Sequence, residues 1–134
     1  MIGIDTNILV RFLTQDDPVQ ALQAERLLTT QCSAAQPGWI SIIALCEVVW
    51  VLGRGYRYPR EQIVLAIAQL LRTAELEIED SDLVRDALER FAAGKYDFAD
   101  ALIGLRNQRR GVSETYTFDQ NAATLPEFRL LTGK

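Results

Sequence analysis

The sequence predicts an α/β protein in which a mainly parallel sheet of short strands carries helices on both faces. The main observation is that short apolar runs, bounded by polar residues, alternate with longer segments whose apolar residues recur at helical spacing. Hydrophobic residues make up 49% of the chain, which is enough for a core without cross-links. The 134 residues fit one domain and contain no internal repeat or linker, so we expect residues 1–134 to form a single domain.

The first sixty residues predict two strands and three helices. In chain order we expect a buried strand at Ile2–Ile4, a helix carrying Ile8 to Leu13, a helix from Pro18 to about Thr30, a strand at Trp39–Ile40 and a buried helix at Ile42–Leu52. Ser41 is a good N-cap for the last of these helices, and Gly53 is expected to end it. The apolar face of the second helix is expected to consist of Val19, Leu22, Leu27 and Leu28.

The rest of the chain predicts three more helices and three more strands. In chain order we expect an amphipathic helix at Glu61–Arg72, a strand at Leu76–Ile78, a helix that Ser81 caps and that carries Leu83 to Phe91, a helix near Phe98–Arg109, a strand at Tyr116–Phe118 and a last strand at Phe128–Leu131.

Composition and charge exclude several classes of function. The net charge of −4 argues against non-specific binding of nucleic acid, because attraction to phosphate needs a basic surface. The chain contains no His, which excludes Ser-His-Asp catalysis and zinc sites built on two His. Cys32 and Cys46 have no metal-binding spacing and indicate a reducing compartment, so we expect a cytoplasmic protein. We expect neither a secretory signal nor a membrane span, because no apolar run has the required length and flanks.

Two acids stand where predicted strands end. Asp5 follows Ile2–Ile4, and Asp119 follows Tyr116–Phe118. Ligands of open α/β sheets bind beyond the carboxyl ends of the strands, so both carboxylates are candidates for a functional site. The structural alternatives are that Asp5 caps the following helix and that Asp119 is a turn residue.

Glu47 lies in the middle of the apolar run Ile42–Leu52. A carboxylate that is buried without a partner is very costly, so Glu47 either lies on an exposed stripe of its helix or pairs with a cation. Its neighbours on a helix are all apolar, which favours a cation over an exposed stripe. These neighbours are Ile43, Ala44, Trp50 and Val51.

Asp97 and Asp100 are three residues apart, on one face at the start of a predicted helix. As an N-cap and a first-turn acid they would complement the helix dipole. This alternative explains Asp97 better than Asp100, because Leu102 and Ile103 predict that Asp100 lies near the core.

Taken together, these acids indicate a metal site if they converge at one edge of the sheet. Carboxylates that cluster without Lys, His or Cys favour a hard divalent cation, Mg²⁺ or Mn²⁺. Acidic clusters that hold such cations catalyse cleavage of phosphodiester bonds.

With these motifs the chain resembles the PIN-domain nucleases, and more narrowly the VapC-type toxin ribonucleases of toxin–antitoxin pairs. The resemblance covers the whole chain and rests on Ile4–Leu9, Glu47 after Ser41–Ile43, Asp97–Ile103 and Thr117–Asp119. It implies that the catalytic and metal-binding acids are Asp5, Glu47, Asp100 and Asp119. Asp97 matches a family position that is often Ser or Asp, so a metal ligand and a helix cap both remain open for it. Thr6, Asn7 and Thr117 match supporting polar positions.

The resemblance also carries expectations for the whole protein. It implies a three-layer α/β/α sandwich, RNA cleavage that depends on Mg²⁺ or Mn²⁺, a homodimer, and an antitoxin protein that occupies the active site.

Two other functions remain open. One is a PIN-like scaffold that binds RNA or protein without cutting. The other is a phosphoaspartyl phosphatase, which would need an acid where Asn7 stands and a downstream Lys, and neither Lys95 nor Lys134 is well placed.

The segment Gly53–Arg60 is the strongest shift in composition, because it holds three Arg, two Tyr and no acid. Arg pairs with phosphate and Tyr stacks on unpaired bases, so Arg54, Arg57 and Arg60 are candidates for RNA binding. The alternative is an ordinary solvated turn before a helix.

Overall fold

The computed structural model describes residues 1–133, which form two compact units. The first unit extends from Met1 to Ser81, and the second begins at Asp82. Each unit has its own sheet and its own buried core.

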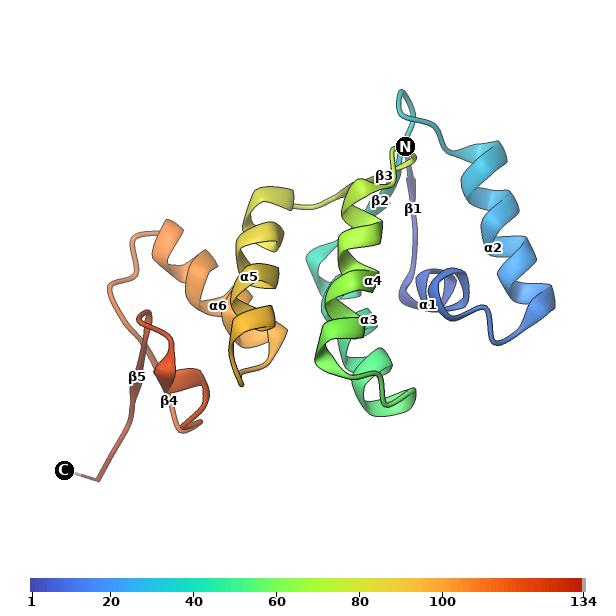
Figure 1. Cartoon of the computed structure of the whole chain (residues 1–134). Helices are drawn as coiled ribbons and strands as arrows, with labels where there is room; N and C mark the ends of the chain where they lie inside the picture. Colours follow the sequence, from blue (N-terminus) through green and yellow to red (C-terminus); the bar gives the residue numbers. More distant parts are fainter. Residues whose placement is uncertain (134) are drawn as a thin grey trace. The chain divides into compact units, whose positions relative to one another are not determined.

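The first unit consists of three short parallel strands and the helices that connect them (Figure 1). Its elements are β1 (Ile2–Gly3), α1 (Thr6–Thr14), α2 (Pro18–Gln31), β2 (Gly38–Ile40), α3 (Ile42–Trp50), the π-helix η1 (Val51–Gly55), α4 (Arg60–Arg72) and β3 (Leu76–Ile78). The strands lie in the order β1-β2-β3, with Ile2 opposite Gly38 and Ile40 opposite Ile78. The predicted strands and helices of this half are therefore confirmed in position, and so is the N-cap Ser41, whose hydroxyl accepts the N–H of Ala44. The predicted burial of the first strand is wrong, because Ile2 and Gly3 are exposed and only Ile4, directly after β1, is buried.

The buried face of α2 differs from the predicted one. Ala21, Ala24 and Leu28 are buried, whereas Val19 and Leu22 are 66% and 46% exposed. Because α2 packs on α1, small alanines on the packed face allow the two helices to approach closely. The prediction is confirmed for Leu28, while Leu27 is half-buried. It is wrong for Val19 and Leu22 and missed the two alanines, because it followed the largest apolar side chains rather than the small ones.

The end of α3 also differs from the prediction. The α-helix ends at Trp50 and continues as one π-helical turn, so Gly53 does not end it. Turns of this type occur mostly as single insertions, often at functional sites. The predicted burial of the whole segment is wrong as well, because Ile43 and Trp50 are 75% and 64% exposed.

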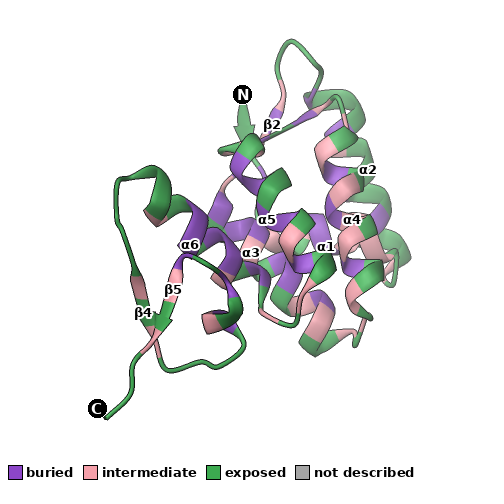
Figure 2. Ribbon diagram, turned by 60° about the vertical axis from the view of Figure 1, so that its left-hand side comes forward, coloured by how far each residue is buried: buried purple, intermediate pink, exposed green. Residues whose placement is uncertain are grey.

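The second unit consists of two helices and a pair of parallel strands. Its elements are α5 (Ser81–Ala93), α6 (Phe98–Arg109), β4 (Thr115–Thr117), the 3-10 helix η2 (Ala122–Thr124) and β5 (Phe128–Leu130). In β4 and β5, Thr115 lies opposite Phe128 and Thr117 opposite Leu130. The core of this unit includes Phe91 and Phe98, whose rings meet edge to face with centroids 6.0 Å apart. Both α5 and α6 carry buried and exposed stretches (Figure 2).

The predicted α/β class with short, parallel strands is confirmed, and the strands form one sheet in each unit.

A buried acid that the sequence did not reveal is Glu127, which is 8% exposed and forms an ion pair with Arg90 of α5. Within residues 1–133, no helix is both long enough and apolar enough to cross a membrane.

Candidate active site

The predicted site residues fall into two groups, one in each unit. The first group contains Asp5, Thr6, Asn7 and Glu47, and the second contains Asp97, Asp100, Thr117 and Asp119.

Asp5 lies between β1 and α1 and is the N-cap of α1. Its Oδ1 accepts the backbone N–H of Thr6 at 2.7 Å, so the predicted capping role is confirmed. This bond uses one carboxylate oxygen, and among the described residues Oδ2 accepts no hydrogen bond. Because the Asp5 side chain is exposed, its second oxygen can take a ligand from solution.

Glu47 lies on the exposed side of α3, contrary to the favoured prediction. Ile43, Glu47 and Trp50 follow the spacing i, i+4, i+7 and share an exposed stripe. The helix buries its opposite side, with Leu45 and Val48 fully inaccessible, so the apolar neighbours of Glu47 do not imply that it is buried. No basic side chain among the described residues forms an ion pair with Glu47.

Thr6 connects the two acids of the first unit. Its hydroxyl donates a hydrogen bond to Oε1 of Glu47 at 2.8 Å, and its backbone N–H binds Asp5. A carboxylate at the end of β1 and a carboxylate in the middle of α3 are therefore held next to the same residue. Asn7, in the first turn of α1, is exposed and lines a groove between α1 and α2.

In the second unit, Asp97 and Asp100 lie at the start of α6. Asp97 occupies the N-cap position with an extended backbone, but its side chain makes no capping hydrogen bond. Asp100 is half-buried in the first turn. Burial, followed by the charges of Asp97 and Asp119, raises the pKa of Asp100 above its usual value. Asp97 and Asp119 therefore both lie close enough to Asp100 to disfavour its charged form.

Asp119 has the turn geometry that the sequence offers as its structural alternative. Its Oδ1 accepts the backbone N–H groups of Asn121 and Ala122 at 2.7 and 3.1 Å, and its own N–H donates to Oγ1 of Thr117 at 3.0 Å. These bonds fix the carboxylate directly after β4 and leave it exposed.

The donor atoms in both groups are suited to a hard divalent cation, because they are carboxylate and hydroxyl oxygens. In neither unit do the described residues bring three or more His, Cys, Asp or Glu into a geometry that would by itself hold a metal ion.

The basic segment Gly53–Arg60 is partly engaged within the first unit. The Tyr56 hydroxyl donates to Oδ2 of Asp16 at 2.6 Å and accepts from Nη1 of Arg11 at 2.9 Å. The hydroxyl of Tyr56 is therefore engaged within the protein, and stacking of its ring on a base stays a prediction. Arg54 and Arg57 remain exposed.

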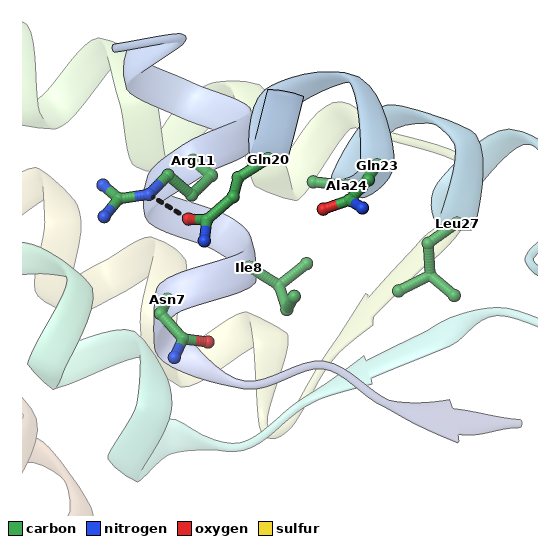
Figure 3. A pocket seen from close by; sticks show the side chains of 7 residues that line it. All are labelled: Asn7, Ile8, Arg11, Gln20, Gln23, Ala24 and Leu27. Carbon is green, nitrogen blue, oxygen red and sulfur yellow. Dashed lines mark hydrogen bonds between the residues drawn. The ribbon is translucent and has the colours of Figure 1, made fainter. Parts of the chain in front are cut away.

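A groove between α1 and α2, with a volume of about 380 Å³, was not predicted from the sequence. Figure 3 shows the side chains that line it, and they come from both helices. The available signal was the spacing of Gln20, Gln23, Ala24 and Leu27, which places these residues on one face of a helix.

Comparisons with known proteins agree with the resemblance. The family model of the PIN domain matches residues 2–127. The chain belongs to the PIN domain family. The predicted resemblance and fold class are thereby confirmed. The chain is similar to the VapC ribonuclease of Aquifex aeolicus (strain VF5), with 22% identity over 116 residues, which cover 86% of this chain and 84% of the relative.

A solved structure is also similar to this PIN-domain chain. It is that of Mycobacterium tuberculosis VapC20, described as a Sarcin-Ricin loop cleaving toxin. Its sequence is 25% identical, the match covers 92% of this chain and 94% of that chain, and the TM-score is 0.44.

Proposed function

We propose that this PIN-domain protein is an endoribonuclease that hydrolyses RNA phosphodiester bonds with a bound Mg²⁺ or Mn²⁺. The observation that carries the proposal is the position of Thr6, whose backbone and hydroxyl hold Asp5 and Glu47 at one place on the exposed surface. Membership of the PIN family and similarity to a VapC ribonuclease support it. Since the family match spans both units, we propose that residues 1–134 act as one PIN-like domain.

The proposal includes the metal-binding acids that the family resemblance implies. Asp5, Asp100 and Asp119 would be ligands, Glu47 would position the cation or its water, and Asp97 would assist. A bound cation of this kind lowers the pKa of its water and stabilises the leaving oxygen. Thr6 orients Glu47 through its hydroxyl, and the two N–H groups at Asp119 hold that carboxylate in one orientation.

We further propose that the protein is the toxin of a toxin–antitoxin pair in the cytoplasm. An uninhibited ribonuclease would damage its own cell, so an inhibitor must accompany it. An antitoxin Arg is suited to occupy the acidic site, because a guanidinium pairs with a carboxylate through two hydrogen bonds. A helix of the antitoxin would lie on α1 and α2, where Phe12 and Leu13 are half-buried, and on α4.

A homodimer completes the proposal. The resemblance to the VapC-type toxins is what implies this dimer.

Thermal melting with increasing Mg²⁺ or Mn²⁺ tests the metal site. Mass action predicts a gain of about 2.7 kcal/mol at a hundredfold excess over the dissociation constant. Asp17→Asn is a matched control for Asp5→Asn, because Asp17 is the N-cap of α2 and Asn caps helices as well as Asp does. We expect the wild type and Asp17→Asn to gain stability and Asp5→Asn to gain much less. An equal rise of the melting temperature in all three proteins, or no rise in any of them, would contradict a metal site at Asp5.

The strongest competing function is a scaffold that binds RNA without cutting it. It predicts RNA affinity that is unaffected by Asp5→Asn and no new RNA ends at any concentration of metal.

A further inference from the structure

The groove between α1 and α2 has an apolar floor and a polar rim (Figure 3). The floor consists of Ile8, Ala24 and Leu27, which are buried or half-buried. The rim consists of three exposed amide side chains and one guanidinium: Asn7, Gln20, Gln23 and Arg11. With a volume of about 380 Å³, the groove is in the range of sites that bind small molecules.

The rim presents hydrogen-bonding groups that the protein does not use internally. The side-chain amides of Asn7 and Gln23 have no hydrogen-bond partner among the described residues. Gln20 is held in place, because its Oε1 accepts Nε of Arg11 at 2.7 Å. The amide nitrogen of Gln20 remains able to donate to a ligand.

Arg11 serves to position the rim rather than to bind an anion. Its Nη1 contacts both carboxylate oxygens of Asp16 at 3.2 and 3.3 Å and the hydroxyl of Tyr56 at 2.9 Å. The guanidinium charge is thus paired within the protein, and no carboxylate lines the groove. The groove therefore favours a neutral ligand over a phosphate or a metal ion.

A nucleobase fits this combination of surfaces. Its flat face is suited to an apolar floor, and its edge carries neighbouring donors and acceptors that Asn and Gln amides recognise. The groove also begins close to the proposed catalytic acids, because Asn7 lies two residues after Asp5 in the first turn of α1.

We propose that the groove between α1 and α2 binds one unpaired base of the RNA, next to the bond that is cut. This inference rests on the proposed ribonuclease function and adds to it a subsite that selects the base. Gln23 and Gln20 read the edge of the base, while Ile8 and Leu27 contact its face.

Cleavage of a single-stranded RNA of random sequence tests the selection. Gln23→Leu removes the amide at an exposed position of α2, and Leu is a good helix former. The matched control is Gln69→Leu, the same change at an exposed position of α4 outside the groove. Mapped ends should show a base preference at one position in the wild type and the control, and this preference should fall roughly tenfold in Gln23→Leu. An unchanged preference in Gln23→Leu would overturn the proposal while leaving the ribonuclease function intact.

A binding measurement that needs no cleavage separates the two proposals. In chelator, the side-chain amide signals of Gln20 and Gln23 are followed by NMR while each of the four nucleoside monophosphates is added. If one of the four nucleotides moves these amide signals more than the others do, the result supports the subsite, even if the protein cuts no RNA. Signals that do not move with any nucleotide at millimolar concentration would overturn it.

Discussion

Asp100 carries a charge that opposes folding when no cation is bound. Burial and the charges of Asp97 and Asp119 raise its pKa, so Asp100 stabilises the fold only while it is protonated. This stability is present below the unfolded pKa of about 3.9 and is lost as the pH rises through the folded value. We expect Asp100→Asn to raise the melting temperature in chelator at pH 7 and to have little effect at pH 3.

The control for this prediction is Asp82→Asn, which removes one negative charge from an exposed position in the first turn of α5. Acids in a first turn are favourable, so the control should not raise the melting temperature. An equal rise in both variants would mean that the total charge of −4, and not local repulsion, is responsible.

Asp16 shows the opposite effect and connects α1 with Tyr56, the residue that follows η1. The hydroxyls of Tyr56 and then Thr14 hold the pKa of Asp16 below its usual value. The resulting stability is present above the unfolded pKa of about 3.9 and is lost as the pH falls through the folded value. We expect Tyr56→Phe to lower the melting temperature at pH 7 but not at pH 2.

Tyr58→Phe is the control, because the Tyr58 hydroxyl makes no hydrogen bond to a described residue, although its ring lies 6.1 Å from that of Tyr56. A decrease in Tyr56→Phe that is equally large at pH 2 and pH 7 would assign the effect to packing rather than to the Asp16 carboxylate.

Gly104 allows α6 to approach β5 closely. A Cβ at this position would lie 2.7 Å from Cε2 of Phe128 and 3.3 Å from Cβ of Glu127. We expect Gly104→Ala to lower the free energy of unfolding by about 1–3 kcal/mol, as measured by urea denaturation, because overpacking forces neighbours to move. Gly55→Ala should not have this cost, because a Cβ at Gly55 would lie 3.7 Å from its nearest neighbour, Cγ1 of Val51, which is an ordinary contact distance. A Gly104→Ala protein as stable as the wild type would mean that the Phe128 ring moves freely.

The elements were predictable where local chemistry determines them. Asp5, Pro18 and Ser41 mark helix starts by rules that involve only neighbouring residues, and all three have the expected positions. The exposure of Ile43 and Trp50 was not predictable in this way. An apolar run does not reveal which side of a helix will face the core, since this depends on packing partners far along the chain.

The same distinction applies to the candidate site. The capping and turn roles of Asp5 and Asp119 follow from their position after strands, and both are confirmed. The hydrogen bond from Thr6 to Glu47 joins residues 41 apart, so no local pattern predicts it. The groove between α1 and α2 depends on the helix pairing through Ala21 and Ala24, which the apolar pattern of α2 did not reveal.

At the scale of the whole molecule, an acidic protein that binds RNA needs a local basic surface. Arg54 and Arg57 are exposed next to the π-helical turn. We expect Arg54→Ala with Arg57→Ala to weaken binding of single-stranded RNA in chelator. The slope of log affinity against log salt should fall by about 0.7 for each phosphate that is no longer neutralised.

The control removes two exposed arginines elsewhere, Arg26→Ala with Arg72→Ala, and changes the net charge equally. Equal weakening in both double variants would mean that net charge alone is responsible and that Gly53–Arg60 is an ordinary solvated turn.

The most direct test of a metal-dependent ribonuclease is cleavage of total RNA by the purified protein, followed by mapping of the new ends. The reaction is run with Mg²⁺, with Mn²⁺ and with chelator, for the wild type, Asp5→Asn, Asp119→Asn and the control Asp17→Asn. We predict new ends at defined positions for the wild type and Asp17→Asn when a metal is present. We predict none in chelator and none for Asp5→Asn or Asp119→Asn. Full cleavage in chelator, or by the Asp5→Asn protein, would contradict a catalytic metal site built on these acids.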